Sequence, residues 1–409
     1  MAPFPLALNA LIGPIGAALV YLAIGFAFGY VLEIAGFGSS PKLAAQFYFR
    51  DLTVLKVMFT GIVVAMLLIF GASALSLLDL NLIWVNPTYL WPGLLGGLIM
   101  GVGFILGGLC PGTSLVALST LKVDGLFYVL GALFGIFLFG ETVDSFGVFW
   151  NSSYLGRLML PEWLGLPTGV VALIVVLMAL FMFWGGEQLE RIVGGVDLKR
   201  APKLRHAGAG LLVAGGVALV ALGQPTTAEK WSKVAAKMEP QLSGRQVYIE
   251  PGELLHTLHD HELKLLMLDV RDEADYNLFH LADARHVPQA QIDSLIDELH
   301  EEPANTVIVL MSNDEAAATG AWKVLAAESV RNVYVLEGGV NAWLDVFAVG
   351  DGRMQAIEPG GEDELRYAFS LALGGAFPAS DPDPHAYELE YTPKIKLEMR
   401  RGPTGKGCG

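Results

Sequence analysis

The sequence has few charged residues and few cysteines, and each shortage excludes a class of protein. Only 16% of the 409 residues are charged, whereas 53% are hydrophobic, which is too apolar for an ordinary soluble enzyme. The two cysteines, Cys110 and Cys408, are too few for a disulfide framework or a four-cysteine zinc site. The sequence also has no basic stripe that would neutralise phosphates, which argues against a nucleic-acid partner.

The charges that are present lie mostly in the C-terminal part. Ten basic and ten acidic side chains occur up to Gln224, whereas 16 basic and 31 acidic ones follow it, so the later part carries the whole formal net charge of -15. This division predicts a membrane domain joined to a soluble domain. We expect a membrane domain at 1–223, a linker with a short exposed helix at 224–246, a soluble domain at 247–350 and a C-terminal extension at 351–409 with a hairpin around residues 387–397.

Six apolar stretches are long enough to cross the roughly 30 Å of hydrocarbon in a bilayer. They are residues 8–32, 52–78, 93–109, 123–140, 168–184 and 207–222. No positively charged region precedes the first stretch, so we expect a retained span and not a cleaved signal peptide. Basic residues gather after the first and fifth stretches, which predicts cytoplasmic loops there. The soluble domain would then lie on the periplasmic side of a bacterial inner membrane.

Residues 107–115, Gly-Gly-Leu-Cys-Pro-Gly-Thr-Ser-Leu, interrupt this apolar pattern. Pro111 cannot continue a helix that begins before it, but it suits the first position of a new helix. A broken helix would place Cys110, Pro111, Gly112, Thr113 and Ser114 at a positive helix end at membrane depth. Transporters hold anions at such ends, and a thiol suits a substrate that contains sulfur. The residue types alone leave open that Cys110 is a small buried side chain in a proline kink.

This segment, together with the earlier residues 36–51, resembles the YeeE/YedE thiosulfate-transporter family over about residues 25–145. The resemblance implies import of a small sulfur-containing anion, foremost thiosulfate, past buried cysteines. Full-length members carry two copies of a repeat, whereas this sequence shows one. Ser39 and Ser40 lie where members often have a cysteine, and we expect them to hydrogen-bond the anion. A second subunit would complete the pathway, which predicts a homodimer or larger homo-oligomer in the lipid bilayer.

Residues 268–288 and 333–343 resemble the rhodanese-like domain over about residues 247–350. The resemblance implies a small α/β domain, and the alternation of short apolar runs with helical patterns also predicts a parallel sheet covered by helices. In active members a cysteine begins the loop after the fourth strand. Here the matching loop consists of Met311, Ser312, Asn313, Asp314, Glu315 and Ala316. A thioether cannot form a persulfide, so we expect a catalytically inactive domain for substrate capture or regulation, with Asp269 and Arg271 as a structural pair beneath the loop.

The sequence therefore favours a transporter over an enzyme, and no motif indicates a cofactor or a metal. His256, His259 and His261 have no cysteine nearby, and we expect them on the surface. Two alternatives stay open. Cys408, in a basic tail, is a candidate sulfur acceptor for a membrane-anchored sulfurtransferase. The membrane part would instead be a tether if the protein were a non-transporting interaction module.

Overall fold

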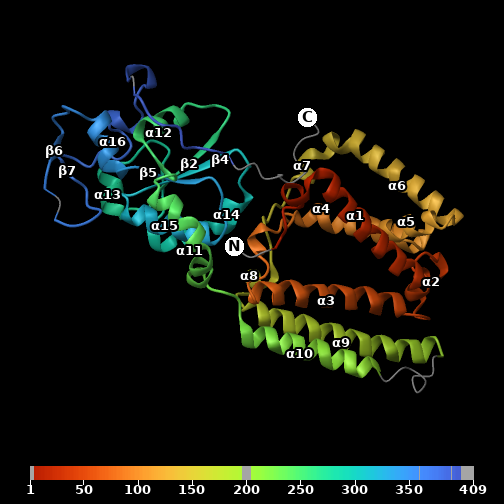
Figure 1. The fold of residues 1–409 in the computed structure, drawn as a ribbon. Coiled ribbons are helices and arrows are strands. Elements are labelled where there is room, and N and C mark those ends of the chain that lie inside the picture. The colour runs from red at the N-terminus through yellow and green to blue at the C-terminus, as the bar shows by residue number, and fades with distance from the viewer. Residues whose placement is uncertain (1–3, 196–203, 359, 388, 398–409) are drawn as a thin grey trace. The chain divides into compact units, whose positions relative to one another are not determined.

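A computed structural model describes residues 4–195, 204–358, 360–387 and 389–397 (Figure 1). The chain divides into two compact units, and each is described by itself. One unit contains residues 2–80 and 85–224, and the other contains residues 81–84 and 225–409.

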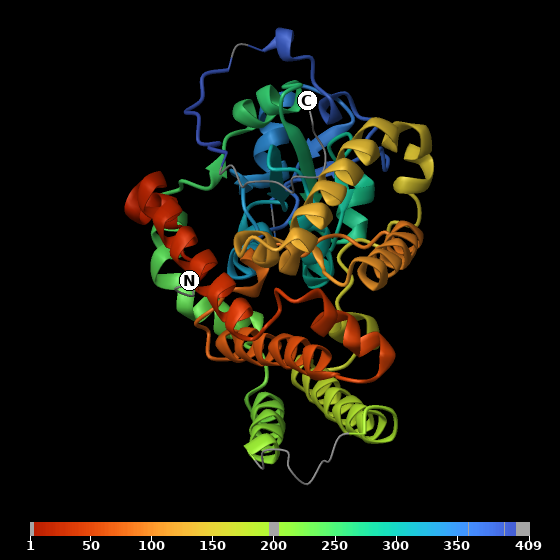
Figure 2. The ribbon, with the colours of Figure 1, turned by 90° about the vertical axis from the view of Figure 1, so that its right-hand side faces the viewer.

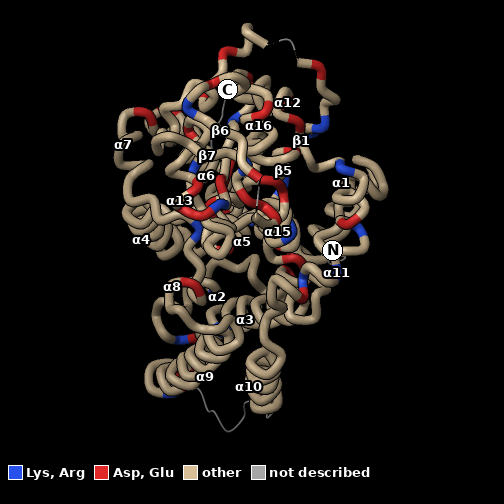
Figure 3. The backbone as a smooth tube through the Cα atoms, turned by 90° about the vertical axis from the view of Figure 1, so that its left-hand side faces the viewer, with Lys and Arg blue, Asp and Glu red and all other residues tan. Residues whose placement is uncertain are grey.

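The first unit is helical, and its described residues contain six segments that are long and apolar enough to cross a membrane. They are α1 (Leu8–Ile34), α3 (Thr53–Ala74), α4 with α5 (Leu90–Gly107 and Pro111–Ser119), α6 with α7 (Val123–Thr142 and Gly147–Trp150), α9 (Thr168–Val193) and α10 (Leu204–Leu222). The tubes of α3, α9 and α10 carry almost no charged residues along most of their length (Figure 3). The six predicted spans and the break in the third are thus confirmed.

Helices α3, α9 and α10 pack against one another (Figures 1 and 2). Their shared core includes Val63, Val176 and Ala179, which are at most 1% exposed. Small residues permit the close approach of α9 and α10, because a Cβ at Gly169 would lie 2.6 Å from the carbonyl oxygen of Leu219. This three-helix group therefore has tight internal packing.

Ion pairs join one end of the same three helices. The buried carboxylate of Glu190 on α9 accepts hydrogen bonds from Lys56 Nζ and from the backbone N–H of Leu52, each at 2.5 Å. Glu187 binds Arg205 of α10 at 2.7 Å. Both carboxylates thus have a basic partner, as charges near a membrane require.

A second group of helices surrounds the break between α4 and α5. Its core contains Phe37, Leu43, Leu109 and Ala117, all at most 2% exposed, with Val54 of α3. The short helix α2 (Ser40–Ala44) and the 3-10 helix η1 (Ala45–Tyr48) follow α1 and approach this core. Segments far apart in the sequence therefore pack next to the break.

The second unit contains a five-stranded parallel sheet with strand order β1-β5-β4-β2-β3. The strands are β1 (Tyr248–Ile249), β2 (Lys264–Asp269), β3 (Arg285–His286), β4 (Thr306–Met311) and β5 (Val333–Leu336). The helices are α11 (Thr227–Ser243), α12 (Pro251–Leu258), α13 (Glu273–Leu278), α14 (Ile296–Glu301), α15 (Ala316–Ala327) and α16 (Gly339–Phe347), with the 3-10 helices η5 (Gln289–Leu295), η6 (Pro378–Ser380) and η7 (Pro384–Ala386). The predicted α/β class is confirmed.

Apolar side chains cover both faces of this sheet. One face packs against α12 and α16, with Leu254 and Trp343 fully buried, and the other packs against α15, with Leu325 fully buried. Strand β4 is buried at every position, as expected for the centre of a parallel sheet with helices on both faces. The carboxyl end of β4 leads directly into residues 311–316, where the resemblance to the rhodanese-like domain predicts the active-site loop.

Two segments outside residues 247–350 also contribute to the core of this unit. The sequence suggests a linker with an exposed helix at 224–246, but Trp231 of α11 packs edge-on against Trp322 of α15, with ring centroids 6.3 Å apart. From the C-terminal extension, Phe377 and Ala379 are buried among the residues of α16. Both segments therefore pack as integral parts of the α/β unit.

The extension holds a short antiparallel pair that the sequence pattern does not predict in this place. The expected hairpin lay at 387–397, yet no strand occurs among the described residues of that range. The pair instead joins β6 (Met354–Ala356) to β7 (Tyr367–Phe369). Residues 389–397 form no strand. Glu253 of α12 accepts hydrogen bonds from the backbone N–H groups of Lys394 and Ile395, and the hydroxyl of Tyr334 in β5 binds the backbone of Lys396. Side chains therefore satisfy this backbone in place of a strand ladder.

Candidate functional site

The break between α4 and α5 is built by three residues with different backbone conformations. Gly108 ends α4 in the left-handed region, with φ 65°, which favours glycine. Cys110 is extended, with φ −98° and ψ 166°, and forms the N-cap of α5. Pro111 then occupies the first helical position. The local sequence thus ends one helix and starts the next within four residues.

Cys110 and Thr113 form a reciprocal cap at the start of α5. The Sγ atom of Cys110 accepts the backbone N–H of Thr113 at 3.4 Å, and the backbone N–H of Cys110 donates to Thr113 Oγ1 at 2.9 Å. Thr113 is 3% exposed, whereas Cys110 is only half-buried. The sulfur also lies 3.2 Å from Thr113 Oγ1, where either atom can be the donor. The S–H hydrogen is therefore available to a bound anion only when it does not donate to this hydroxyl.

Ser114 lies beneath this cap and is 1% exposed. Its hydroxyl donates to the carbonyl oxygen of Pro111 at 2.8 Å, while its backbone N–H donates to the carbonyl oxygen of Cys110 at 2.9 Å. Both donors of Ser114 therefore stabilise the first turn of α5. Pro111 and Gly112 are exposed in the single chain, next to the thiol.

The contacts of α5 place its N-terminus well inside the span of α6. Nine residues of α5, at about 1.5 Å each, cover roughly half of a 30 Å hydrocarbon layer. The two helices pack closely, because a Cβ at Gly125 would lie 2.6 Å from the backbone nitrogen of Leu118. At the break, a Cβ at Gly107 would lie 2.7 Å from the ring of Tyr128, the sixth residue of α6. A half-length helix beside a full one is the arrangement of a re-entrant segment.

The structure brings Ser40 next to the break. A Cβ at Gly108 would lie 3.0 Å from the carbonyl oxygen of Ser40. The hydroxyl of Ser40 donates to Asp124 Oδ2 at 2.6 Å, so it reaches an anion only if it leaves this carboxylate. Ser39 is the N-cap residue of α2, and its N–H donates to the carbonyl oxygen of Gly36.

The basic side chains near this region are paired within the chain. Lys122 Nζ lies 3.1 Å from Glu33 Oε1, and Lys42 Nζ donates to the carbonyl oxygen of Ala35 at 2.7 Å. At the start of α3, Asp51 accepts the backbone N–H of Thr53 at 2.9 Å. Burial acts to raise the pKa of Asp51, but the Thr53 hydrogen bonds outweigh it and lower that pKa below its ordinary value. The break itself thus offers the positive end of α5 and a thiol in place of a fixed cation, while the N–H groups of Thr113 and Ser114 are bound within the first turn.

The loop after β4 begins with Met311, which the resemblance places at the position of the nucleophilic cysteine. Met311 is fully buried, and Ser312 and Asn313 are 1% and 4% exposed. Arg271 lies beneath them and binds Asp269 at 2.6 Å, with both side chains at most 1% exposed. The same guanidinium donates to Asn313 Oδ1 at 3.2 Å. This is the structural pair expected from the sequence.

The two acidic residues of the loop each bind an arginine. Asp314 lies 2.6 Å from Arg366. Glu315 lies 2.6 Å from Arg245 and also accepts the backbone N–H of Gly338 at 2.7 Å. The hydrogen bond from Arg245 to Glu315 raises the pKa of that guanidinium. Ala316 then begins α15.

Sequence reasoning misses one residue of this loop region entirely. Asp363, from the C-terminal extension, accepts the backbone N–H groups of Asp314 and Ala317, each at 2.6 Å. Nothing in the local sequence marks Asp363, because its partners lie 49 and 46 positions away. Only the fold places this carboxylate on the loop.

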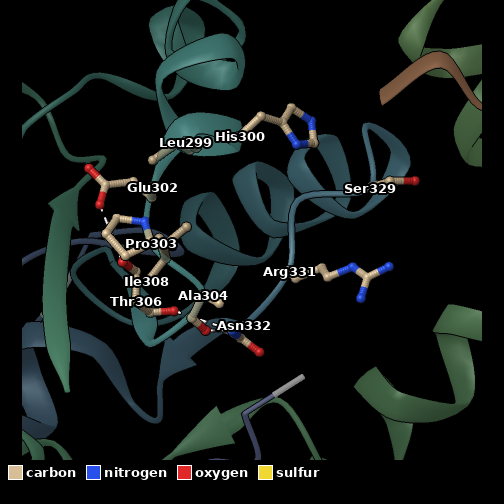
Figure 4. Close-up of a pocket in the computed structure, with 10 residues that line it drawn as sticks. All are labelled: Leu299, His300, Glu302, Pro303, Ala304, Thr306, Ile308, Ser329, Arg331 and Asn332. Carbon is tan, nitrogen blue, oxygen red and sulfur yellow. Dashed lines mark hydrogen bonds between the residues drawn. The ribbon is translucent and has the colours of Figure 1, made fainter. Parts of the chain in front are cut away.

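The other candidates from the sequence contribute no further site. His256, His259 and His261 are exposed, and no group of three or more His, Cys, Asp or Glu side chains with metal-binding geometry occurs among the described residues. Cys408 lies outside the described residues. A pocket lined by Glu302, Thr306 and Asn332 lies at the amino end of β4 (Figure 4), whereas ligands of parallel sheets bind at the carboxyl ends.

Two family models match the chain in the order expected from the sequence. The model described as sulphur transport matches residues 35–236, and the rhodanese-like domain matches residues 250–345. The first match extends past residue 145 and includes α9 and α10. No curated protein matches the chain, and no solved structure matches it.

The membrane helices therefore match the YeeE/YedE sulphur transport domain, and a rhodanese-like domain follows them in the chain. With six helical segments able to cross a bilayer, the chain is a multi-pass membrane protein with a role in sulfur transport.

Proposed function

We propose that the protein transports thiosulfate and that the anion binds at the break between α4 and α5. The observation that carries this proposal is the cap in which Cys110 Sγ accepts the N–H of Thr113 at the start of a half-length helix. The helix N-terminus favours negative charge, and the polarizable thiol offers an S–H donor to the outer sulfur of thiosulfate. Pro111 and Gly112 are exposed beside the thiol. The hydrogen bonds of Thr113 and Ser114 stabilise the first turn of α5.

The paired charges around the break support reversible binding. A fixed, unpaired lysine would hold a dianion tightly, whereas the positive end of a helix and a thiol bind it weakly enough for release. In the described structure Lys122 binds Glu33 and Ser40 binds Asp124. We infer that Ser39 and Ser40 form the entry to the site, where an arriving anion exchanges hydrogen bonds with Asp124.

We further propose that two copies of the chain form the working transporter. Within the described residues, a Cβ built on Gly93, Gly97 or Gly101 of α4 meets no atom within 4 Å. In an 18-residue apolar stretch of α1, and in one of α6 with α7, only 6% of the residues are buried. In the corresponding stretch of α9 the buried share is 33%. A small-residue stripe on α4 that contacts nothing in its own chain suits the close approach of a second α4.

The rhodanese-like domain has no catalytic role in this proposal. Met311 provides no thiolate, and it is fully buried at the end of β4. We infer that the domain regulates transport or captures the anion. We place it on the periplasmic side of a bacterial inner membrane, from the distribution of basic loop residues.

Uptake of labelled thiosulfate into proteoliposomes tests the proposal. Cys110→Ala should reduce uptake about tenfold or more, because a hydrogen bond to a charged group contributes about 1.5 kcal/mol or more. Cys110→Ser keeps a smaller and less polarizable donor. Its uptake should lie between that of Cys110→Ala and that of the unaltered chain. Cys408→Ala is the matched control and should transport like the unaltered chain.

The outcomes also separate the two alternatives. Uptake that is unchanged in Cys110→Ala would overturn the proposed pathway. Thiosulfate-dependent persulfide on Cys408 without any uptake would support a sulfurtransferase. Neither uptake nor persulfide would support a tethered interaction module.

A further inference from the structure

The carboxylate of Glu328 is buried at the end of α15 and accepts hydrogen bonds from side chains of two other segments. Its side chain is 7% exposed. Oε2 accepts from Lys230 Nζ at 2.5 Å and from Asn81 Nδ2 at 2.7 Å, and Oε1 accepts from Thr227 Oγ1 at 2.9 Å. The backbone carbonyl oxygen of Glu328 also accepts from Asn81 Nδ2, at 3.0 Å. One residue therefore joins α15 to α11 and to residue 81.

The segments that Glu328 binds are places where the chain passes between membrane helices and the α/β unit. Residues 81–84 belong to the α/β unit, yet in the sequence they lie between α3 and α4. Thr227 begins α11, shortly after α10 ends at Leu222. The carboxylate thus holds the chain beside α3 and α4 as well as beside α10 in the sequence.

The charge of Glu328 makes these contacts strong and mutually dependent. A carboxylate that is removed from water needs donors, and its hydrogen bonds are about twice as strong as those between neutral groups. Lys230 provides a positive charge, and its side chain remains 31% exposed. Asn81 and Thr227 are neutral, so their contacts with Oε2 and Oε1 depend on the charge of the same carboxylate. Loss of this charge should therefore loosen both segments together.

Helix α15 connects Glu328 to the loop that follows β4. The 12-residue helix begins at Ala316, directly after that loop, and Glu328 is its C-cap. Leu325 is fully buried in the core beside the sheet, and Trp322 packs edge-on against Trp231 of α11 (Figure 1). A helix that is packed on two sides moves as a rigid element. A displacement at its start is therefore transmitted to Glu328.

We propose that Glu328 is a clasp through which the α/β unit acts on the membrane helices. A shift of α15 moves Asn81 and Thr227 together, and the chain carries the shift into α3, α4 and α10. Helix α4 is the important recipient, because it ends at the break, where Gly108 is its C-cap. The clasp is a property of the α/β unit, whereas its effect on uptake rests on the proposed transport function.

Hydrogen exchange of the full-length protein in lipid nanodiscs tests the clasp. Glu328→Gln keeps the size of the side chain but loses its charge, and it should speed amide exchange about tenfold at 80–84 and at 227–230. Asn81→Ala should speed exchange at 80–84 by a similar factor. The double variant should fall well short of the product of the two effects, because both changes weaken the same contact.

Glu298→Gln is the matched control for the loss of a carboxylate. Glu298 lies on α14, where its exposed side chain binds Arg285. This variant should leave exchange at 80–84 and at 227–230 unchanged. The amides of β4 show whether each variant remains folded.

Uptake of labelled thiosulfate into proteoliposomes tests the coupling to the membrane helices. Asn81→Ala should reduce the initial rate about fivefold or more, which is the lower range of coupling between separate sites. Asn151→Ala is the matched control, because Asn151 is exposed and donates to the carbonyl oxygen of Gly147 within its own turn. This control should transport like the unaltered chain.

The clasp is overturned if Glu328→Gln leaves exchange at 80–84 unchanged in a folded domain, or if the effects of Glu328→Gln and Asn81→Ala simply multiply. Normal uptake by Asn81→Ala, despite faster exchange, would overturn the coupling and leave Glu328 as an anchor only. If the unaltered chain takes up no thiosulfate, the proposed function fails, and the exchange measurements alone then decide the clasp.

Discussion

At the residue scale, Cys110 caps α5 and, in the proposed pathway, would also bind the anion. As an N-cap, its sulfur satisfies the N–H of Thr113, a position that serine, threonine, aspartate or asparagine normally fills. An alanine at this position would remove the cap as well as the thiol. The comparison of Cys110→Ser with Cys110→Ala is therefore needed to distinguish anion recognition from helix capping.

The Arg271–Asp269 pair is the other residue-scale feature with a large expected effect. Its charges are almost completely removed from water, and the guanidinium also donates to the carbonyl oxygen of Phe279 at 2.6 Å. Removing one member leaves the other charge buried without compensation. The pair thus holds the loop after β4 in place.

Arg271→Met should destabilise the rhodanese-like domain by about 3–5 kcal/mol, because Asp269 becomes an unpaired buried charge. Arg285→Met, which breaks the exposed pair with Glu298, should cost no more than about 1 kcal/mol. Native-state hydrogen exchange of the β2 and β4 amides in the intact protein measures both. Equal effects of the two variants would contradict the structural role of Arg271.

At the element scale, α11 shows how a segment with linker-like composition becomes part of a core. Its N-terminus has a capping box, in which Glu229 N donates to Thr226 Oγ1 and Thr226 N donates to Glu229 Oε2. Its apolar residues, including Trp231 and Val234, lie on one face. A helix with one apolar face gains most of its stability from the surface that it covers.

The capping box gives α11 a pH dependence. The hydrogen bond from the Thr226 backbone to Glu229, with a smaller one from its side chain, lowers the pKa of Glu229 below its ordinary value of 4.5. A depressed folded-state pKa stabilises the helix above pH 4.5, and this contribution is lost as the pH falls through the folded-state pKa. Amide exchange in the first turn of α11 should therefore accelerate below about pH 4.5, beyond its intrinsic pH dependence.

Glu229→Gln is the matched variant for this prediction. It keeps an acceptor for the Thr226 N–H but cannot ionise, so the additional acceleration at low pH should disappear. Glu239→Gln, on the exposed C-terminal half of the same helix, should retain it. Identical pH dependence of amide exchange in Glu229→Gln and in the unaltered chain would show that Glu229 does not cause the acceleration.

At the scale of the whole molecule, the proposed dimer can be tested at the glycine stripe of α4. Gly97→Leu should convert a dimer into a monomer in nanodiscs, because the side chain prevents close approach of two helices. Gly25→Leu on α1, where a Cβ also meets nothing within 4 Å among the described residues, should remain dimeric. Native mass spectrometry measures the masses, and a monomeric unaltered chain would refute the dimer.

The position of the soluble domain relative to the membrane can be tested by labelling. In a chain that lacks Cys110 and Cys408, His261→Cys on the exposed surface should react with a membrane-impermeant maleimide in bacterial spheroplasts. Arg191→Cys at the end of α9 should react only after permeabilisation, since basic loops stay in the cytoplasm. The reverse pattern would place the rhodanese-like domain in the cytoplasm.

The sequence by itself determined the local features of this protein. Runs of apolar residues predicted six spans because a helix must satisfy its own backbone in lipid. Pro111 and the two glycines before Cys110 predicted the break for steric reasons. The strand-like runs around β2, β4 and β5, which share one parallel sheet, predicted the α/β class because each pattern depends only on near neighbours.

Only the tertiary structure decided which distant residues meet. It brought Ser40 to Gly108, packed α11 on α15 and set Asp363 on the N–H groups after β4. It also showed that the expected hairpin at 387–397 was wrong, because the carboxylate of Glu253 binds that segment in place of a partner strand. Such contacts depend on how the whole chain folds, and a local sequence pattern does not specify which distant residues come together.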